Sequence, residues 1–521
     1  MSRGSEYLDE DDGPTDIPEQ PAELDPTSPD ANPVVTPVGQ LAWETAHANS
    51  ANTGFARVDT ARAVSPQRVT RVGLVAPGAN PVVAPDGTVY IGTVQGELRA
   101  FRADGTAYWT RQLNYSEHGG IHASPVVGAD GSVYVISTHT VKIRDHQGDD
   151  DDFYTYVRSD SFLHKFTPGG GWVFQQAFPE RYSGSEYTAN RGATNAPPNL
   201  WRWNGTEAIM VPVVYKHLVG PELRLIAFAT GGGVLADQLV TAASSPQTTD
   251  GDECFDFWGP AGWFFCPPYY LGVALDLGAS FDAPEGPLEH VGIPMPGVAI
   301  RQDPQRGAPL VVMTDGKHDK IAFSFSPQTG FSQVARSSHT ASIFTTPPVV
   351  QGYRTMVGTA ASKLTFADSN FAQLPAVGLD MVGLDILTAA PTLLADGHIV
   401  VIGRGGTLNM IDGLLNPSLE WREPLSGVSI ASAAASCTHF FVATTDELAT
   451  YDAKSLTRVA TLPWVDGGLS APVIGPGGHV YAIVSSNLFV FLPPIRSIQD
   501  QVTGRTACDG LAGDSPGKYH P

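Results

Sequence analysis

The sequence predicts an all-β protein, an eight-bladed β-propeller built from four-stranded antiparallel blades. Its composition, with Gly 55, Pro 42 and only 16% charged residues, is typical of many short strands joined by turns. No long stretch shows the 3.6-residue periodicity of a helix. A unit of about 40–44 residues recurs along the chain, which is the length of one propeller blade.

Residues 80–113, NPVVAPDGTVYIGTVQGELRAFRADGTAYWTRQL, form the reference unit. A short apolar run is followed by the turn dipeptide Asp86-Gly87 and by a β-branched and aromatic run. Leu98 and Phe101 then belong to a third strand, and Asp104-Gly105 turns into a fourth strand that carries Trp109. Four strands joined by tight turns are one blade.

Two anchors repeat through the chain. The first begins the innermost strand and is a proline in all units but one: Pro81, Pro125, Pro197, Pro296, Pro348, Pro391, Ser432 and Pro472. The second is a leucine in the third strand, followed three residues later by an apolar residue: Leu98, Leu163, Leu225, Leu364, Leu408, Leu448 and Leu488, with a degenerate version around Ile321. Together they define eight units.

Trp109, Trp172 and Trp421 fall in the fourth strands of their units, where we expect them to pack between neighbouring blades. The eighth unit, residues 471–494, supplies three strands only. The strand-like run at residues 67–76 has no unit of its own, so we expect it to complete the last blade. This pairing closes the ring and removes the open sheet edges.

The chain divides into a leader, a propeller and a tail. Residues 1–40 are acidic and Pro-rich, with ten acidic residues and one basic residue in the first 30, and we expect them to be disordered. The propeller spans 41–496, with insertions at 142–158 and 241–295, and 497–521 form a C-terminal tail.

The charge and the cysteines indicate which partners and which cellular compartment to expect. The net charge is −22, and no Lys/Arg cluster could follow a phosphate backbone, so we expect no nucleic-acid partner. No apolar run is long enough to span a membrane, and the first residues lack the apolar core of a signal peptide. Four cysteines fit two disulfides, Cys254–Cys266 and Cys437–Cys508, or four separate thiols. We favour an exported protein, with a cytoplasmic one as the alternative.

The unit pattern resembles a known family. Inner strands written [AS]-P-V-V, followed by D-G-x-V-Y-I, G-x-L-x-A-F and a Trp strand, look like the PQQ-type repeat of quinoprotein dehydrogenases and of the propeller lipoprotein of the outer-membrane assembly machinery. The dehydrogenase branch implies a bound quinone, a calcium ion and a disulfide between adjacent cysteines. Here no two cysteines are adjacent. The resemblance therefore favours the lipoprotein branch, and we expect no cofactor, with calcium as the alternative.

Polar residues precede several inner strands and would converge at one mouth of the central channel. They predict a ring that could bind a metal or a small polar ligand, against the alternative of ordinary solvated loops. Its members are His118, Arg191, His290, His339, Asp385 and Asp466, with His122 and Asn195 deeper in the channel.

The two insertions carry the other candidates. The loop between Cys254 and Cys266 and the residues after it are aromatic, which predicts a surface for a protein or glycan partner, or else a self-packed cap. Its residues are Trp258, Trp263, Phe264, Tyr269 and Tyr270. In the first insertion, Asp149 and Asp151 are weak candidates for calcium because the loop lacks the spacing of a known calcium motif.

No sequence motif of a hydrolase, metalloprotease or nucleotide-binding protein occurs. The sequence therefore favours a non-enzymatic binding or scaffold propeller that presents its insertions to a protein or glycan. The alternative is an enzyme at the channel mouth, such as a polysaccharide hydrolase or lyase. A quinone-dependent dehydrogenase is a weaker alternative.

Overall fold

The computed structural model of the chain describes residues 43–113, 119–146, 153–182, 189–215, 222–242, 297–301, 308–315, 319–338, 344–351, 354–359, 361–368, 370–379, 387–413, 417–494 and 506–508. These ranges contain strands and turns but no helix, and hence no helix able to cross a membrane. The aromatic loop at 254–270 lies outside the described residues.

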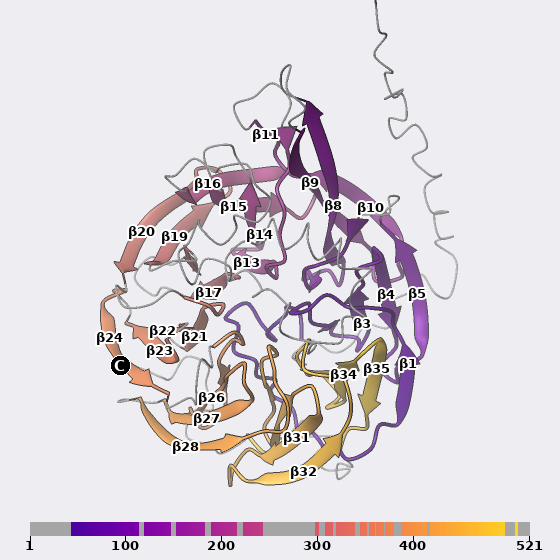
Figure 1. Ribbon diagram of the computed structural model, residues 1–521, viewed down its shortest axis with the longest axis vertical. Helices are drawn as coiled ribbons and strands as arrows, with labels where there is room; N and C mark the ends of the chain where they lie inside the picture. The colour runs from indigo at the N-terminus through magenta and orange to yellow at the C-terminus, as the bar shows by residue number, and fades with distance from the viewer. Residues whose placement is uncertain are drawn as a thin grey trace, which may run out of the picture.

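Eight four-stranded antiparallel sheets stand around a common centre, which confirms the predicted propeller (Figure 1). From the centre outward, the first four blades are β2 (Val82–Val83), β3 (Val89–Gly92), β4 (Glu97–Phe101) and β5 (Ala107–Gln112); β7 (Val126–Val127), β8 (Val133–His146), β9 (Phe153–Phe166) and β10 (Trp172–Ala177), with β6 (Gly119–Gly120) beside β8; β13 (Asn199–Trp203), β14 (Thr206–Tyr215), β15 (Glu222–Ala229) and β16 (Val234–Ala242); and β17 (Ala299–Arg301), β18 (Leu310–Thr314), β19 (Asp319–Ser326) and β20 (Gly330–Ser338).

Blades 5 to 8 follow the same order. They are β21 (Val349–Gln351), β22 (Arg354–Gly358), β23 (Lys363–Ala367) and β24 (Gln373–Gly378); β25 (Thr392–Leu393), β26 (Ile399–Ile402), β27 (Thr407–Asp412) and β28 (Ser418–Pro424); β29 (Ala434–Ala435), β30 (His439–Ala443), β31 (Glu447–Asp452) and β32 (Arg458–Pro463); and β33 (Val473–Ile474), β34 (Val480–Val484), β35 (Asn487–Phe491) and β1 (Arg68–Arg71). Every innermost strand begins within three residues of its anchor, as the repeat predicts.

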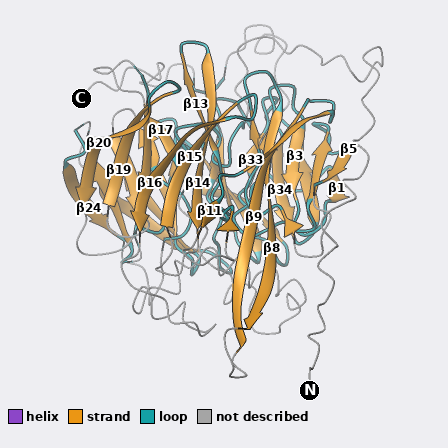
Figure 2. Ribbon diagram, turned by 90° about the horizontal axis from the view of Figure 1, so that it is seen from above, coloured by secondary structure: helices purple, strands orange, loops and turns teal. Residues whose placement is uncertain are grey.

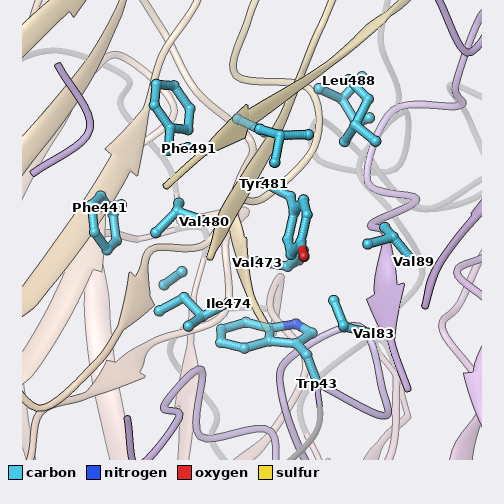
Figure 3. Packing of buried hydrophobic residues seen from close by; sticks show 14 of the residues in the cluster. Trp43, Val83, Val89, Phe441, Val473, Ile474, Val480, Tyr481, Leu488 and Phe491 are labelled. Atoms are coloured by element: carbon cyan, nitrogen blue, oxygen red, sulfur yellow. The ribbon is translucent and has the colours of Figure 1, made fainter. Parts of the chain in front are cut away.

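The ring is closed by the predicted exchange of termini. β1 pairs antiparallel with β35, from Arg68 opposite Val490 to Arg71 opposite Asn487. The strand is shorter than residues 67–76 because the chain leaves β35 at Gly73, whose φ is +87°, and turns toward blade 1. A buried apolar cluster then joins blade 8 to blade 1, with Tyr481, Val83 and Trp43 among its members (Figure 3).

Two of the three predicted inter-blade tryptophans are confirmed, and one is wrong. Trp109 donates its indole N–H to the Pro168 carbonyl of blade 2 at 2.9 Å, and Trp421 packs 6.4 Å from Tyr451 of blade 7. Trp172 is 38% exposed at the first position of β10. A register shift in β10 gives the inter-blade position to Phe174, which touches Gly232 of blade 3.

Blade 2 carries a long hairpin. β8 and β9 pair in unbroken register over 14 residues, from Val133 opposite Phe166 to His146 opposite Phe153. The outer half of this ribbon, residues 141–146 and 153–158, which we call the arm, projects beyond the disc (Figure 2). In a propeller the loops between second and third strands share one face with the blade-to-blade connections. The arm therefore leaves the ring on this loop face.

The base of the arm is braced by the connection between blades 2 and 3. β11 (Arg181–Tyr182) pairs with β12 (Ala189–Asn190) in that connection. Beside it, Arg191 forms an ion pair with Asp160 of β9 at 3.2 Å, and the buried Ser161 hydroxyl donates to the Gly192 carbonyl at 2.9 Å. The arm therefore leaves the disc from a fixed base.

Candidate functional site

The centre of the ring is occupied by the chain itself. Residues 43–58, which we call the central segment, run among the innermost strands, where the indigo trace lies in Figure 1. The segment has no strand partner of its own apart from isolated bridges such as Trp43 to Val83 and Phe55 to Ala435. Its shape is set by the blades around it.

Successive carbonyls along this segment accept hydrogen bonds from successive blades around the ring. In six blades the second residue of the innermost strand donates its N–H to the segment. The bonds are Val83 to Trp43 (2.8 Å), Val127 to Glu44 (2.9 Å), Ile300 to Ser50 (2.7 Å), Val350 to Ala51 (2.9 Å), Leu393 to Thr53 (2.8 Å) and Ala435 to Gly54 (2.8 Å). The innermost strands would otherwise present open edges to the channel. The central segment thus satisfies these edges.

The side chains of two asparagines add further hydrogen bonds around the segment. Asn52 donates to the carbonyls of Val298 and Pro348, at 2.8 and 2.9 Å, in the connections that lead into blades 4 and 5. Asn80 donates to the Ala46 carbonyl at 3.1 Å and accepts the N–H of Ala471 at 2.7 Å, which links blades 1 and 8. The segment is therefore bound on all sides, as a ligand in a site would be.

Two histidines at this centre are buried and neutral. His47 lies in the central segment and His122 precedes the inner strand of blade 2; they are 7% and 5% exposed. Burial lowers the pKa of each imidazole to about 4. His47 Nδ1 and His122 Nε2 have no hydrogen-bond partner among the described residues.

The predicted ring of polar residues is described only in part. His118, His290, His339 and Asp385 lie outside the described residues, as do Asp149 and Asp151 and the pair Cys254 and Cys266. The described residues contain no group of three His, Cys, Asp or Glu side chains able to hold a metal ion. The ligand ring therefore stays a prediction.

The four described members of the ring occupy different surroundings. His122 is buried near the centre, whereas Arg191 is engaged with Asp160 and with Glu180, at 3.7 Å, beside the arm. Asn195 is half-buried before the inner strand of blade 3, and Asp466 is exposed on a turn with φ +60°. The described contacts do not join these four residues to one another.

One of the two suggested disulfides is present. Cys437 and Cys508 are bonded, with their Cα atoms 5.1 Å apart. The neighbouring Ala507 donates its N–H to the Asp59 carboxylate at 2.8 Å, just beyond the central segment. The disulfide therefore holds the C-terminal tail beside the place where the N-terminal segment leaves the centre.

The sequence matches no protein-family model, and no curated protein matches it. Solved structures similar to this chain include BamB from Moraxella catarrhalis, with 12% identity over 82% of this chain and 99% of that one and a TM-score of 0.35. A europium-containing methanol dehydrogenase has 9% identity over 85% and 89%, with a TM-score of 0.43. Sqt1 from Saccharomyces cerevisiae has 9% identity over 84% and 100%, with a TM-score of 0.46. At these values the likenesses carry no information on function.

The alignment of blade 4 around Ile321 is wrong by one residue. In blade 1, Glu97 closes the turn by accepting the N–H of Thr93, and Leu98 follows it; in blade 4, Asp319 accepts the N–H of Asp315, and Lys320 follows. The anchor leucine of the other blades is therefore replaced by Lys320, not by Ile321. A lysine at this position does not fit the apolar pattern of the other units, whereas the neighbouring Ile321 does.

Proposed function

We propose that this chain is a non-enzymatic binding propeller whose partner is engaged on the loop face, with the arm as the main contact. The observation that supports this is the central segment. Ligand sites favour concave, preformed cavities, but here the chain's own backbone takes up the inner edges of six blades. A partner would then contact the parts of the chain that project from the disc.

The arm suits such a contact. Residues 141–146 of β8 and 153–158 of β9 pair with each other and, among the described strands, with no third strand. A two-stranded ribbon with free edges is marginal in water by itself, and its open N–H and C=O groups can accept another strand. The partner class we propose is a protein, with a glycan bound by the aromatic insertion at 254–270 as the second candidate.

We also propose that the protein is exported, since disulfides such as Cys437–Cys508 persist in oxidising compartments. We likewise propose that the repeats are related to those of the propeller lipoprotein rather than to those of the dehydrogenases. If it holds, the pair should be oxidised in protein isolated without reductant, as peptide mass spectrometry would show. Free alkylatable thiols at both positions would place the protein in a reducing compartment.

The arm is tested by replacing residues 141–158 with Asn-Gly, which favours a tight hairpin turn. A photo-crosslinking residue at position 145 of the intact protein should capture one discrete species in the producing cell. Untagged intact protein should compete for it, and the shortened protein should not. A matched control, Lys454→Ala, changes an exposed turn between third and fourth strands, on the opposite face; it should compete fully. Equal competition by the shortened protein, or turnover of a polysaccharide panel by the intact protein, would contradict the proposal.

A further inference from the structure

One core position distinguishes blade 4 from the other seven blades. Lys320 is the second residue of β19 and is 0% exposed. It stands directly opposite Thr314, just as Leu98 stands opposite Gly92 in blade 1. The leucines at this position are also 0% exposed: Leu98, Leu163, Leu225, Leu364, Leu408, Leu448 and Leu488. The fold therefore accommodates an apolar side chain here, and blade 4 places an amine in the same space.

The amine has few partners. Lys320 Nζ donates to the Thr365 hydroxyl of blade 5 at 3.3 Å, and it lies 5.5 Å from the centre of the Phe344 ring. The Thr365 hydroxyl itself donates to the Val357 carbonyl at 2.9 Å. An ammonium group has three N–H donors, and these contacts use one. The hydroxyl of Thr314, which shares a face with Lys320, has no partner among the described residues.

No carboxylate among the described residues pairs with this charge. Asp319 precedes Lys320 and therefore points to the other face of the sheet, where it binds Arg336 at 2.5 Å. Asp315 also faces Arg336, at 3.8 Å. The blade 5 residues that Lys320 contacts are uncharged. Burial lowers the pKa of Lys320 to about 8, so the amine remains largely charged at pH 7.

Burying an ammonium group without a described counter-charge destabilises the folded chain, whereas a buried leucine at this position carries no such penalty. Such a cost is usual where a buried group serves a site. We propose that Lys320, positioned by Thr365 and with the Thr314 hydroxyl on the same face, anchors a binding site between blades 4 and 5 for a small oxyanion, a carboxylate or a phosphate group. The anion supplies the negative charge that no described residue supplies, and it accepts the remaining N–H donors of Lys320 and the O–H of Thr314. This site is independent of the arm.

The proposal is tested by thermal unfolding of the full chain with acetate, formate or inorganic phosphate, against chloride at equal ionic strength. The intact protein should show a saturable rise in Tm of a few degrees with one class of anion at pH 7, because a ligand that binds only the folded state stabilises it. The rise should be smaller at pH 9, where the amine is mostly neutral. Comparing the Tm shift in acetate or formate with the shift in phosphate shows which of the two classes of oxyanion binds.

Lys320→Leu restores the residue of the other blades. It should have a higher Tm without anion and no saturable response to acetate, formate or phosphate. Lys363→Gln, at an exposed position of blade 5, should respond as the intact protein does. If Lys320→Leu fails to fold, Lys320→Met, which keeps the length of the side chain, replaces it. The same response in the intact protein and the Lys320 variant, or no response to any of the three anions, would show that Lys320 anchors no such site.

Discussion

The central segment and the arm are two extended stretches of the same chain with opposite surroundings. The carbonyls of residues 43–54 accept N–H groups from six blades, and side chains such as Asn52 add further bonds. Residues 141–146 and 153–158 bond only to each other among the described strands. The bonds of the central segment hold the inner strands of the ring together, whereas the outer edges of the projecting ribbon pair with no other described strand. Four experiments test this difference between the central segment and the arm.

The largest effect is expected from removal of the central segment. A chain that begins at residue 59 loses six bonds to the inner strands, each contributing about 1 kcal/mol, together with the buried Trp43 of the core shared by blades 1 and 8. We expect it to aggregate or to melt several degrees lower, because in a chain of this size each 1 kcal/mol lost lowers Tm by about one degree. The control begins at residue 41 and should melt like the full chain. Equal melting of both chains would show that the segment does not stabilise the ring.

Acid should destabilise the fold through buried histidines. His47, His122 and His164 have pKa values lowered to about 4 by burial, against 6.5 when exposed. Above pH 6.5 both states are neutral and stability is complete; between 6.5 and 4 the unfolded chain binds protons that the folded chain does not. Each residue therefore removes on the order of 3 kcal/mol as the pH falls through this window.

Urea unfolding at pH 7.5, 5.5 and 4.5 measures this slope. His122→Gln should lower the number of protons that the chain takes up on unfolding by roughly one, and the pH dependence of stability should weaken accordingly. His398 is the control because it forms ion pairs with Asp396 and Glu420, at 2.9 and 3.0 Å, and its pKa is raised. His398→Gln should leave the loss of stability between pH 6.5 and 4 in place. A stability that is flat from pH 7.5 to 4.5 would contradict the buried neutral histidines.

A smaller effect is expected from Gly54→Val within the central segment. Gly54 has φ +65°, and a Cβ there would lie 2.8 Å from the Thr392 hydroxyl and 3.3 Å from the Ala433 carbonyl. Strain and displacement should cost about 2–4 kcal/mol in the free energy of unfolding. Gly231→Val is the matched control, since nothing lies within 4 Å of its Cβ and it is not a positive-φ position. A similar loss of unfolding free energy in both variants would contradict the tight packing of Gly54 in the central segment.

The smallest effect on stability is expected from shortening the arm. Replacing residues 141–158 with Asn-Gly removes backbone pairs that the arm makes with itself, from Val141–Arg158 outward. The ion pair of Arg191 with Asp160 and the bond of Ser161 remain. Tm should therefore change by no more than about 2 degrees, since changes away from the packed core are usually small. A large drop would mean that the arm supports the disc.

Much of the fold could be predicted from the repeat. Each unit carries its own turns and inner-strand anchor, so local sequence determined eight blades, and an incomplete eighth unit with an orphan strand determined how β1 and β35 close the ring. The repeat pattern predicts Trp172 at the packing position of blade 2, but a register shift in β10, which the local pattern does not contain, places Phe174 there.

The candidate sites depended more on tertiary structure. Residues 43–58 have no period of their own, because their partners are strands spread from residue 83 to residue 435. The role proposed for Lys320 likewise depends on the register of β18 and β19 and on the Thr365 hydroxyl of blade 5. The number of blades and the closure of the ring can be predicted from the amino-acid sequence, since they follow from contacts within and between neighbouring units. The segment that fills the centre and the core position that holds a charge become visible in the three-dimensional fold alone, since both depend on atoms brought together from distant parts of the chain.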